Sequence, residues 1–530
     1  MDPCRAAHCA VHRETRSRCA KHLGPRSIGS PVTLRHKWER SNGRSHLVRN
    51  FKTAAGRGPA LFEPSTGTRD LRVVVDEADG HIDGDDARVR DLLSGLVRAK
   101  GVYSLRFDGR PRGEGDQDWL TNPARARPGW VEVAAAESGA PYTHDVVYHR
   151  DGVVTGSAIS GDVARGELAV SEPTYAQLAP GVAARRRNAD SVLLGAADAV
   201  GADLLVTERP FLLGGHWFSS LQPLPCTAAE AVALVSQFLR LRGTYPAHAT
   251  GAHGITLQFN RGLFFWVGTR ALLPQGWRWF SHCVEADGDE RLRDLVITAQ
   301  SVFQRIQRSL VARDTLRWQL TLRQNNDVAD DALSEVDRIL VYLVGAFDAI
   351  ARVSHRVLGL AGNEYGAGWQ KDAWRGMVSA PAPDLAAVMA PGAEAADLFE
   401  VMRLMRNSVH GAGLQALGLA RGIGRREGTG VSLPVGETER LLELLEARGW
   451  SDTWGLTEFY EGRFYVAPEA FIEHLLRASL PVLNDLMRLT PIERLIDRPM
   501  TSSGLPPTDG PFAHGDSVLM QLGFPPASVA

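Results

Sequence analysis

The sequence lacks the features that mark secreted and membrane proteins. Its 530 residues include five cysteines, which are too few and too scattered to form a disulfide framework. The N-terminus has no apolar core of the signal-peptide type, and the apolar run at 339–351 is interrupted by Asp348. No internal repeat and no glycine-rich P-loop motif occurs. We therefore expect a cytoplasmic protein that does not contact a membrane.

A strong net charge is also missing, but the charges are unevenly distributed. The chain has 59 Lys and Arg residues against 61 Asp and Glu residues, a formal net charge of −2. Residues 1–60 hold 13 of the basic and 3 of the acidic residues, a net of +10, so the remainder holds 46 against 58, a net of −12. An acidic body argues against a broad, non-specific nucleic-acid surface.

The first 68 residues have the composition of a disordered basic arm, because they are rich in Arg, His, Ser and Gly and have little apolar periodicity. Three interpretations remain open, namely an inert tail, an arm that attracts RNA, and a zinc site. Zinc would use cysteine and histidine ligands, whose spacing matches no regular zinc finger. These residues are Cys4, His8, Cys9, His12, Cys19 and His22.

Two apolar segments that end in carboxylates predict an α/β domain with a parallel sheet. The β-branched run 71–75 has the pattern of a buried strand and is followed by Asp76. A helix over 189–200, a glycine and the strand 202–207 come later, and Glu208 ends that strand. Carboxylates at the C-terminal edge of a parallel sheet are the oxygen ligands that Mg²⁺ or Mn²⁺ requires.

The same half resembles a PIN-like nuclease domain, most strongly in the stretch NADSVLLGAADAVGADLLVTERPFLL. Asp190 and Glu208 lie 18 positions apart and suit the two acids of that pattern. Asp76 suits the leading acid, and Glu172 is the candidate for the remaining one. The resemblance implies a PIN-like α/β domain over residues 69–215 with metal-dependent cleavage at these four carboxylates. The alternative is an inert α/β domain in which Asp190 is a helix-cap residue.

Residues 216–285 predict a small α+β connector between the two halves. A threonine begins an amphipathic helix over 227–241 and suits the cap position. Two short apolar runs, 255–259 and 263–269, flank the sequence NRG and predict a β-hairpin.

The C-terminal half predicts an all-α bundle over residues 286–490, followed by a flexible tail at 491–530. Apolar residues recur at helical spacing in two long segments, which begin near residues 292 and 332. A Gly-rich insert with a short hairpin precedes the last long helix of the bundle. The Pro, Gly and Ser content from residue 499 onward indicates a loose tail.

The segment FEVMRLMRNSVHG at 399–411 places two arginines and a histidine on one side of a helix that is otherwise apolar. Its core-facing stripe consists of Leu398, Met402, Met405 and Val409. Arg403, Arg406 and His410 form a second stripe that borders the first. Arginine stabilises a pentacoordinate phosphate transition state, and histidine moves protons near neutral pH. The alternative is a solvated pair of Arg406 and His410 at the helix end.

The RNSVHG end of this helix, with long amphipathic helices before it, resembles a HEPN domain, an all-α family of RNases and defence proteins. That family carries an arginine and a histidine with four to six residues between them. Six residues separate Arg403 from His410, and three separate Arg406 from it. The resemblance implies metal-free RNA cleavage, in which His410 moves a proton while an arginine holds the phosphate. It also implies a homodimer formed through the helices.

Together the two resemblances predict an RNA-directed endonuclease of a bacterial defence or stress system. Cleavage would proceed without metal at the helix face that carries Arg403, Arg406 and His410, or with Mg²⁺ or Mn²⁺ at the four carboxylates of the α/β half, or at both sites. The competing hypothesis is a non-catalytic sensor or scaffold that binds RNA or a nucleotide and dimerises through its helical half. Under either hypothesis, an antitoxin or a triggering molecule is a possible partner of the protein.

Overall fold

The computed structural model describes residues 69–526 with the exception of several short segments. Those segments are 78–86, 108–128, 136–142, 151–152, 161–172, 214–222, 249–255, 287–291, 323–324, 410–412, 420–427, 461, 498–499 and 501–508. The basic arm predicted at 1–68 therefore lies outside the described residues, as do Glu172 and His410.

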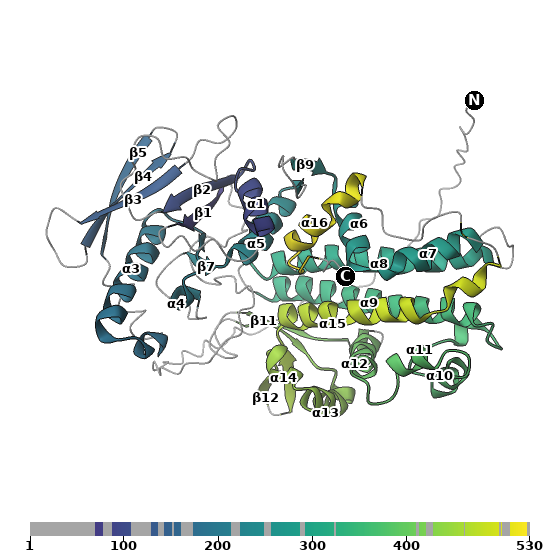
Figure 1. The fold of residues 1–530 in the computed structure, drawn as a ribbon. Coiled ribbons are helices and arrows are strands. Elements are labelled where there is room, and N and C mark those ends of the chain that lie inside the picture. The colour runs from purple at the N-terminus through teal and green to yellow at the C-terminus, as the bar shows by residue number, and fades with distance from the viewer. Residues whose placement is uncertain are drawn as a thin grey trace, which may run out of the picture. The chain divides into compact units, whose positions relative to one another are not determined.

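The N-terminal half is built on a sheet of seven strands (Figure 1). The strands are β1 (Leu71–Asp76), β2 (Val102–Phe107), β3 (Gly129–Ala135), β4 (Thr143–Arg150), β5 (Val153–Ser160), β6 (Leu204–Val206) and β7 (Leu224–Cys226). Their order is β5-β4-β3-β2-β1-β6-β7. Neighbours are parallel from β3 through β2, β1 and β6 to β7, whereas β4 and β5 add an antiparallel edge. The predicted α/β half with parallel strands is confirmed at this level.

Helices cover both faces of the sheet, which explains why the interior strand β1 carries three consecutive valines. Val73 and Val75 pack in one core with α1 (Ala87–Leu96) and α5 (Ala228–Leu241). Val74 packs in a second core with α3 (Pro180–Ala199). All three valines are at most 1% exposed. A strand buried on both faces has no need for the apolar/polar alternation of a half-exposed strand.

The α/β half extends beyond residue 215, because β7 and α5 belong to the sheet and to the layer that covers it. The predicted threonine cap of α5 is confirmed. Thr227 accepts a hydrogen bond from Glu230 N, and the Glu230 side chain accepts one from Thr227 N, so the two residues form a capping box.

The hairpin predicted around residue 261 is wrong. The strand β9 (Thr256–Phe259) pairs with the preceding β8 (Tyr245–His248), and the residues that follow form the helix α6 (Arg261–Leu272). Asn260 caps this helix, since its Oδ1 accepts a hydrogen bond from Leu263 N at 2.8 Å. Asparagine favours both turns and helix caps, and here the apolar residues after it are buried by a helix.

Long helices make up the C-terminal half, where α8, α9 and α15 lie alongside one another (Figure 1). The helices are α7 (Gln275–Glu285), α8 (Arg293–Gln319), α9 (Asn326–Val357), α10 (Asp372–Ser379), α11 (Pro383–Val388), α12 (Glu394–Val409), α13 (Thr438–Arg448), α14 (Trp450–Thr453) and α15 (Pro468–Leu489). The two long helices predicted near residues 292 and 332 are confirmed as α8 and α9. One apolar core joins these helices.

The all-α prediction for this half is wrong in one respect. A four-stranded antiparallel sheet with the order β10-β11-β13-β12 is inserted between α12 and α15. Its strands are β10 (Ala416–Leu419), β11 (Gly428–Ser432), β12 (Thr457–Tyr460) and β13 (Arg463–Val466). The hairpin predicted in this insert is confirmed as the pair β12–β13. Glycine is depleted in strands, so the glycines of β10 and β11 concealed the other two strands in the sequence.

The tail predicted to be flexible at 491–530 contains ordered helices in its described part. These are η8 (Ile492–Leu495), η9 (Gly510–His514) and α16 (Gly515–Gln521). Val518 and Leu522 are fully buried, in the same core as the long helices. The prediction is wrong for these residues, because a short apolar run outweighs the Pro and Gly content around it.

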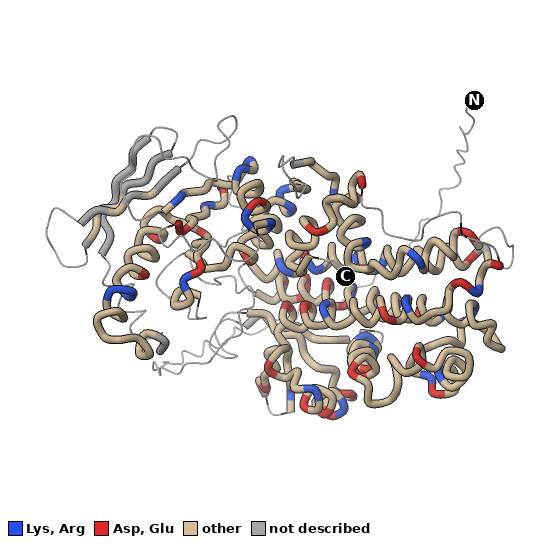
Figure 2. Tube along the Cα trace, in the orientation of Figure 1, with Lys and Arg blue, Asp and Glu red and all other residues tan. Residues whose placement is uncertain are grey.

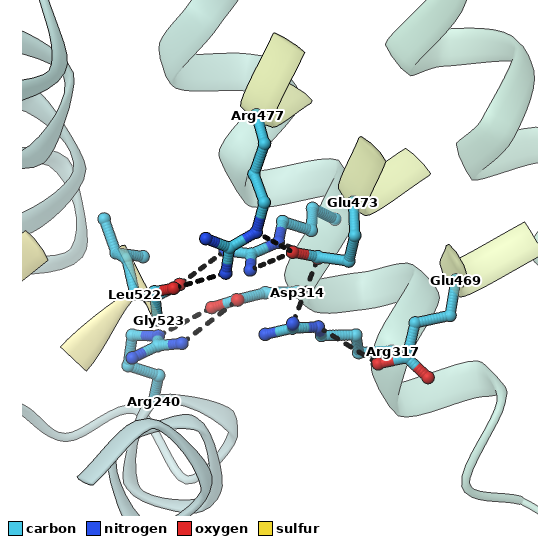
Figure 3. A network of polar contacts seen from close by, with 9 residues as sticks. Arg240, Asp314, Arg317, Glu469, Glu473, Arg477, Leu522 and Gly523 are labelled. Atoms are coloured by element: carbon cyan, nitrogen blue, oxygen red, sulfur yellow. Dashed lines mark hydrogen bonds and ion pairs between the residues drawn. The ribbon is translucent and has the colours of Figure 1, made fainter. Parts of the chain in front are cut away.

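Buried ion pairs and hydrogen bonds fix this C-terminal segment to three helices (Figure 3). Arg240 of α5 donates to the carbonyl of Gln521 in α16 at 3.0 Å, and to both carboxylate oxygens of Asp314 on α8 at 2.6 and 3.0 Å. Arg313 of α8 and Arg477 of α15 donate to carbonyl groups of the two residues after α16, each at 2.6 Å. The guanidinium of Arg313 is buried and needs acceptors, so its bond to the carbonyl after α16 makes the segment a part of the fold.

Charges of both signs are interspersed along the described chain (Figure 2). Among the helices formed by these residues, none combines the length and the apolarity needed to cross a bilayer.

Candidate functional site

The helix α12 carries the arginine stripe predicted from the sequence. Its apolar stripe is confirmed as core for the three side chains that are described, which are at most 1% exposed. These are Leu398, Met402 and Met405. Arg403 and Arg406 are half-buried, and their Nε atoms have no hydrogen-bond partner in the described part of the chain. The helix ends one residue before His410, whose own placement lies outside that part.

Four cations from separate segments act on the half-buried Asp348 of α9. They are Arg352 of α9, Arg406 of α12, Arg305 of α8 and Lys371, just before α10. Burial raises the pKa of Asp348, and the fields of these four cations oppose that rise. Four positive charges against one negative charge leave a net charge of +3. We call these five residues the cation cluster.

Arg305 reaches the cluster by lying against the backbone of α9 at a glycine. A β-carbon placed on Gly345 would overlap the Arg305 guanidinium, so glycine is needed for this approach. Gly345 precedes Asp348 by three residues and therefore shares its side of α9. Burial lowers the pKa of Arg305, and its Nε has no hydrogen-bond partner among the described residues. The cluster thus contains a partly desolvated guanidinium with an unused donor.

A short turn beside the cation cluster carries an exposed tyrosine and is held in place by several contacts. The turn η5 (Glu364–Gly366) is capped by Asn363, whose Oδ1 accepts a hydrogen bond from Tyr365 N at 2.9 Å. Arg356 of α9 forms an ion pair with Glu364 on one side of Tyr365. Lys371 Nζ donates to the carbonyl of the last residue of η5 at 2.9 Å. These contacts fix the backbone on both sides of the tyrosine.

Tyr365 lies next to the cation cluster and is open to solvent. Its side chain is 69% exposed, and the guanidinium carbon of Arg352 lies 5.0 Å from the centre of its ring. Guanidinium groups bind phosphates, and exposed aromatic rings stack on bases. The cluster and the tyrosine together have the chemistry of a binding site for single-stranded nucleic acid.

A second group of charged residues, at the C-terminal edge of the large sheet, is built around an arginine. Arg209 donates to both oxygens of Asp76, from Nε at 2.7 Å and from Nη2 at 3.2 Å, and from Nη1 to Asp190 Oδ1 at 3.0 Å. Tyr175 donates to Asp190 Oδ2 at 2.8 Å. Thr207 Oγ1 donates to Asp76 Oδ2 at 2.9 Å. Two of the predicted carboxylates therefore do come together, and we call these five residues the sheet-edge cluster.

Asp190 enters this cluster from the middle of a helix. The helix α3 begins at Pro180, a residue favoured in the first turn, so the alternative in which Asp190 is a cap is wrong. Burial raises the pKa of Asp190, against hydrogen bonds from Tyr175 and Arg209 that lower it. Burial also acts to lower the pKa of Arg209, but Asp76 and Asp190 raise it overall. The arginine therefore remains charged between the two aspartates.

Glu208 does not join the sheet-edge cluster. Successive side chains of an extended chain point to opposite sides, so Thr207 and Arg209 face Asp76 while Glu208 points away. Its Oε1 accepts a hydrogen bond from Ala228 N at 3.2 Å, at the first residue of α5. A carboxylate at a helix N-terminus is stabilised by the helix dipole.

Asp76 and Asp190, as they are placed, do not fit a divalent cation. Each of their four oxygens accepts a hydrogen bond from Arg209, Tyr175 or Thr207, and the guanidinium bridges the two carboxylates. Mg²⁺ and Mn²⁺ need such oxygens as ligands. In the part of the chain that the structure describes, no three His, Cys, Asp or Glu residues are arranged to hold a metal ion. The fourth predicted ligand, Glu172, lies outside that part.

Several residues of these two sites were missed by the sequence reasoning, among them Arg305, Lys371 and Tyr175, and three others show what signal was present. Arg209 follows a predicted acid, and the alternation of side chains along the strand would have placed it inside. Gly345 stands within a long apolar helix, where glycine signals a close approach of another group. Tyr365 gave no signal, because an exposed tyrosine in a short turn has no characteristic spacing.

Comparison of the chain with protein-family models, curated proteins and solved structures found no match. The chemistry of the two sites is therefore the basis for assigning a function.

Proposed function

We propose that the protein binds single-stranded RNA at the cation cluster and cleaves it without a metal ion. The observation that carries this proposal is the group of cations that act on Asp348, in which the Arg305 guanidinium lies against α9 at Gly345 and Arg352 lies over the ring of Tyr365. One of them, Arg406, belongs to the helix that ends one residue before His410. Guanidinium groups bind phosphate oxygens through paired hydrogen bonds, so a phosphate diester suits a half-buried group of arginines.

The energetics of the cluster favour an anionic ligand. The cluster has a net charge of +3, whereas residues 61–530 as a whole have a formal charge of −12. The cluster therefore attracts phosphate locally, whereas residues 61–530 as a whole do not attract it. Buried Nε donors of Arg305, Arg403 and Arg406 have no acceptor among the described residues. An unsatisfied buried donor costs about 1–3 kcal/mol. A small side-chain adjustment toward a phosphate oxygen would remove this penalty.

The reaction would use the 2′-hydroxyl of RNA as the nucleophile. The 2′-oxygen forms a bond to phosphorus, the bond from phosphorus to the 5′-oxygen breaks, and the products are a 2′,3′-cyclic phosphate and a free 5′-hydroxyl. His410 either takes the proton of the 2′-hydroxyl or gives one to the leaving 5′-oxygen. Arg403 or Arg406 stabilises the charge that develops on the phosphate. DNA lacks the nucleophile and would bind without being cleaved.

The resemblance to HEPN domains supports this chemistry and adds two expectations. A homodimer would form through the helical half, and the setting would be bacterial defence or stress, with an antitoxin or a trigger as partner. The sheet-edge cluster favours cleavage without metal over cleavage with Mg²⁺ or Mn²⁺, because Arg209 bridges its carboxylates.

A second candidate function is RNA binding without cleavage, as a sensor or scaffold. The arrangement of the sheet-edge cluster favours it, since a bridged carboxylate pair has a structural explanation that needs no reaction. The two candidates share the same binding site and differ only in the role of His410.

The test is incubation of the purified protein with a mixed single-stranded RNA pool, in EDTA and separately in Mn²⁺. We expect cleavage in EDTA with 2′,3′-cyclic phosphate ends, and its loss in His410→Ala and Arg406→Gln. Asp190→Asn should cleave at the wild-type rate. RNA binding without cleavage in either buffer would favour the scaffold, and cleavage that needs Mn²⁺ would contradict the metal-free proposal.

A further inference from the structure

We infer that Tyr365 is a stacking platform for one base of the bound RNA strand, so that the cation cluster selects single strands over duplexes. This inference rests on the proposed function, since it assigns a base-binding subsite to the same phosphate-binding site.

The geometry of the turn supports this role. An exposed tyrosine on a mobile loop would lose conformational entropy on binding a base, but the backbone around Tyr365 is already held by Asn363, Arg356 and Lys371. Arg352 lies over the ring at 5.0 Å, and 69% of the residue remains exposed to solvent. The ring is thus supported next to a cation and remains accessible to a base.

Charge next to the ring makes a base the fitting occupant. Arg352 and Lys371 belong to the cation cluster and contact Tyr365 or its turn directly. A phosphate at these cations would bring the neighbouring base of the same strand to the ring. Stacking of one base on an aromatic side chain contributes about 1–3 kcal/mol. Bases paired inside a duplex cannot stack in this way.

The experiment measures binding of a labelled single-stranded RNA and of an RNA duplex by fluorescence anisotropy, in EDTA and with a 2′-deoxy linkage at any cleaved position. We expect Tyr365→Ala to weaken single-strand binding by roughly 5- to 140-fold, which is the stacking free energy expressed as a ratio of dissociation constants. Tyr365→Phe should bind like the wild type, and duplex binding should not change.

The outcomes separate this inference from the proposed function. If Arg406→Gln weakens binding and Tyr365→Ala does not, the base subsite is wrong and the phosphate site stands. An equal loss for single strand and duplex in Tyr365→Ala would also overturn stacking. If the wild type binds neither RNA, the proposed function itself is wrong.

We infer independently that the guanidinium of Arg209 takes the place of a divalent ion between the carboxylates of Asp76 and Asp190, and that these carboxylates would bind such an ion if the guanidinium were removed. It donates three hydrogen bonds to Asp76 and Asp190, at 2.7, 3.2 and 3.0 Å. All three residues are at most 5% exposed. Removing the guanidinium would leave two buried carboxylates close together without their counter-ion, an arrangement that a hard cation stabilises.

The experiment is a Mn²⁺ titration of the full chain, with free Mn²⁺ measured by electron paramagnetic resonance. The wild type and Arg209→Lys should show no saturable site that depends on Asp190. Arg209→Ala should gain one site, roughly tenfold or more tighter than in Arg209→Ala combined with Asp190→Asn. Should Arg209→Ala fail to fold, Arg209→Gln serves in its place.

Two results would overturn the inference about Arg209. One is a wild-type Mn²⁺ site that Asp190→Asn removes, because the metal would then displace the arginine. The other is a folded Arg209→Ala or Arg209→Gln variant whose Mn²⁺ binding equals that of the wild type.

Discussion

Replacement of Arg406 by glutamine should change the salt dependence of RNA binding by a predictable amount. For single-stranded nucleic acid, the logarithm of the binding constant falls with the logarithm of salt concentration, with a slope of about −0.7 for each phosphate neutralised. Four cations of the cluster would contribute a slope of about −2.8 if each one neutralises a phosphate. Affinity should then fall roughly 50-fold between 50 and 200 mM salt, and roughly 18-fold in Arg406→Gln.

The assay is fluorescence anisotropy of a labelled single-stranded RNA at four or more salt concentrations, in EDTA. Arg185→Gln is the matched control, since it makes the same charge change at an exposed position of α3 in the α/β half. The control should keep the wild-type slope. A slope that is the same in Arg406→Gln, Arg185→Gln and the wild type would refute the assignment of the phosphate site to the cation cluster.

Three further substitutions test the packing and the electrostatics. Gly345→Ala should displace the Arg305 guanidinium and weaken RNA binding severalfold, as measured by anisotropy. The helix should stay folded in thermal unfolding, because alanine favours a helix by about 1 kcal/mol over glycine. Unchanged RNA binding would show that Arg305 does not contact the RNA. Burial raises the pKa of Asp337 to about 6, so the folded state loses stability as pH rises through that value. Asp337→Asn should therefore stabilise the protein by on the order of 1–2 kcal/mol at pH 8 and not at pH 4, and an equal gain at both pH values in thermal unfolding would contradict the shift. Leu522→Ala should lower the free energy of unfolding by about 2–5 kcal/mol, since this side chain is fully buried. A denaturant midpoint equal to that of the wild type would mean that the C-terminal segment is not part of the cooperative core.

Periodicity in the sequence correctly predicted helices and strands that are buried on one face or on both faces. The valines of β1 form an uninterrupted apolar run because helices cover both faces of the sheet. The stripe of α12 that contains Met402 and Met405 faces the core as its spacing predicts. In both cases the local pattern shows which faces of the element are buried.

Local patterns failed where two structures suit the same residues. Asn260 suits a turn and a helix cap equally well, and only the burial of Phe264 and Phe265 after it selects the helix. The polar run 185–188 before Asp190, three arginines and an asparagine, gave no reason to extend α3 back to Pro180. The apolar residues of α16 are too few to predict a helix, although the core buries them.

The two candidate sites depend on contacts that the sequence does not contain. Arg209 and Asp76 are separated by 133 positions, and the pairing of β1 with β6 brings them together. The cation cluster draws Arg305, Asp348 and Arg406 from three helices. Asp76, Asp190 and Arg406 could be named as candidates from the sequence, but their partners follow only from the fold.

Crosslinking of bound RNA tests most directly whether the cation cluster is the RNA site. A single-stranded RNA that contains 4-thiouridine would be irradiated with the wild-type protein in EDTA, and the crosslinked peptides identified by mass spectrometry. We predict crosslinks in the peptides around Tyr365 and Lys371 and in the peptide that contains Arg406, and their loss in excess unlabelled RNA. Competed crosslinks confined to the α/β half would contradict the account.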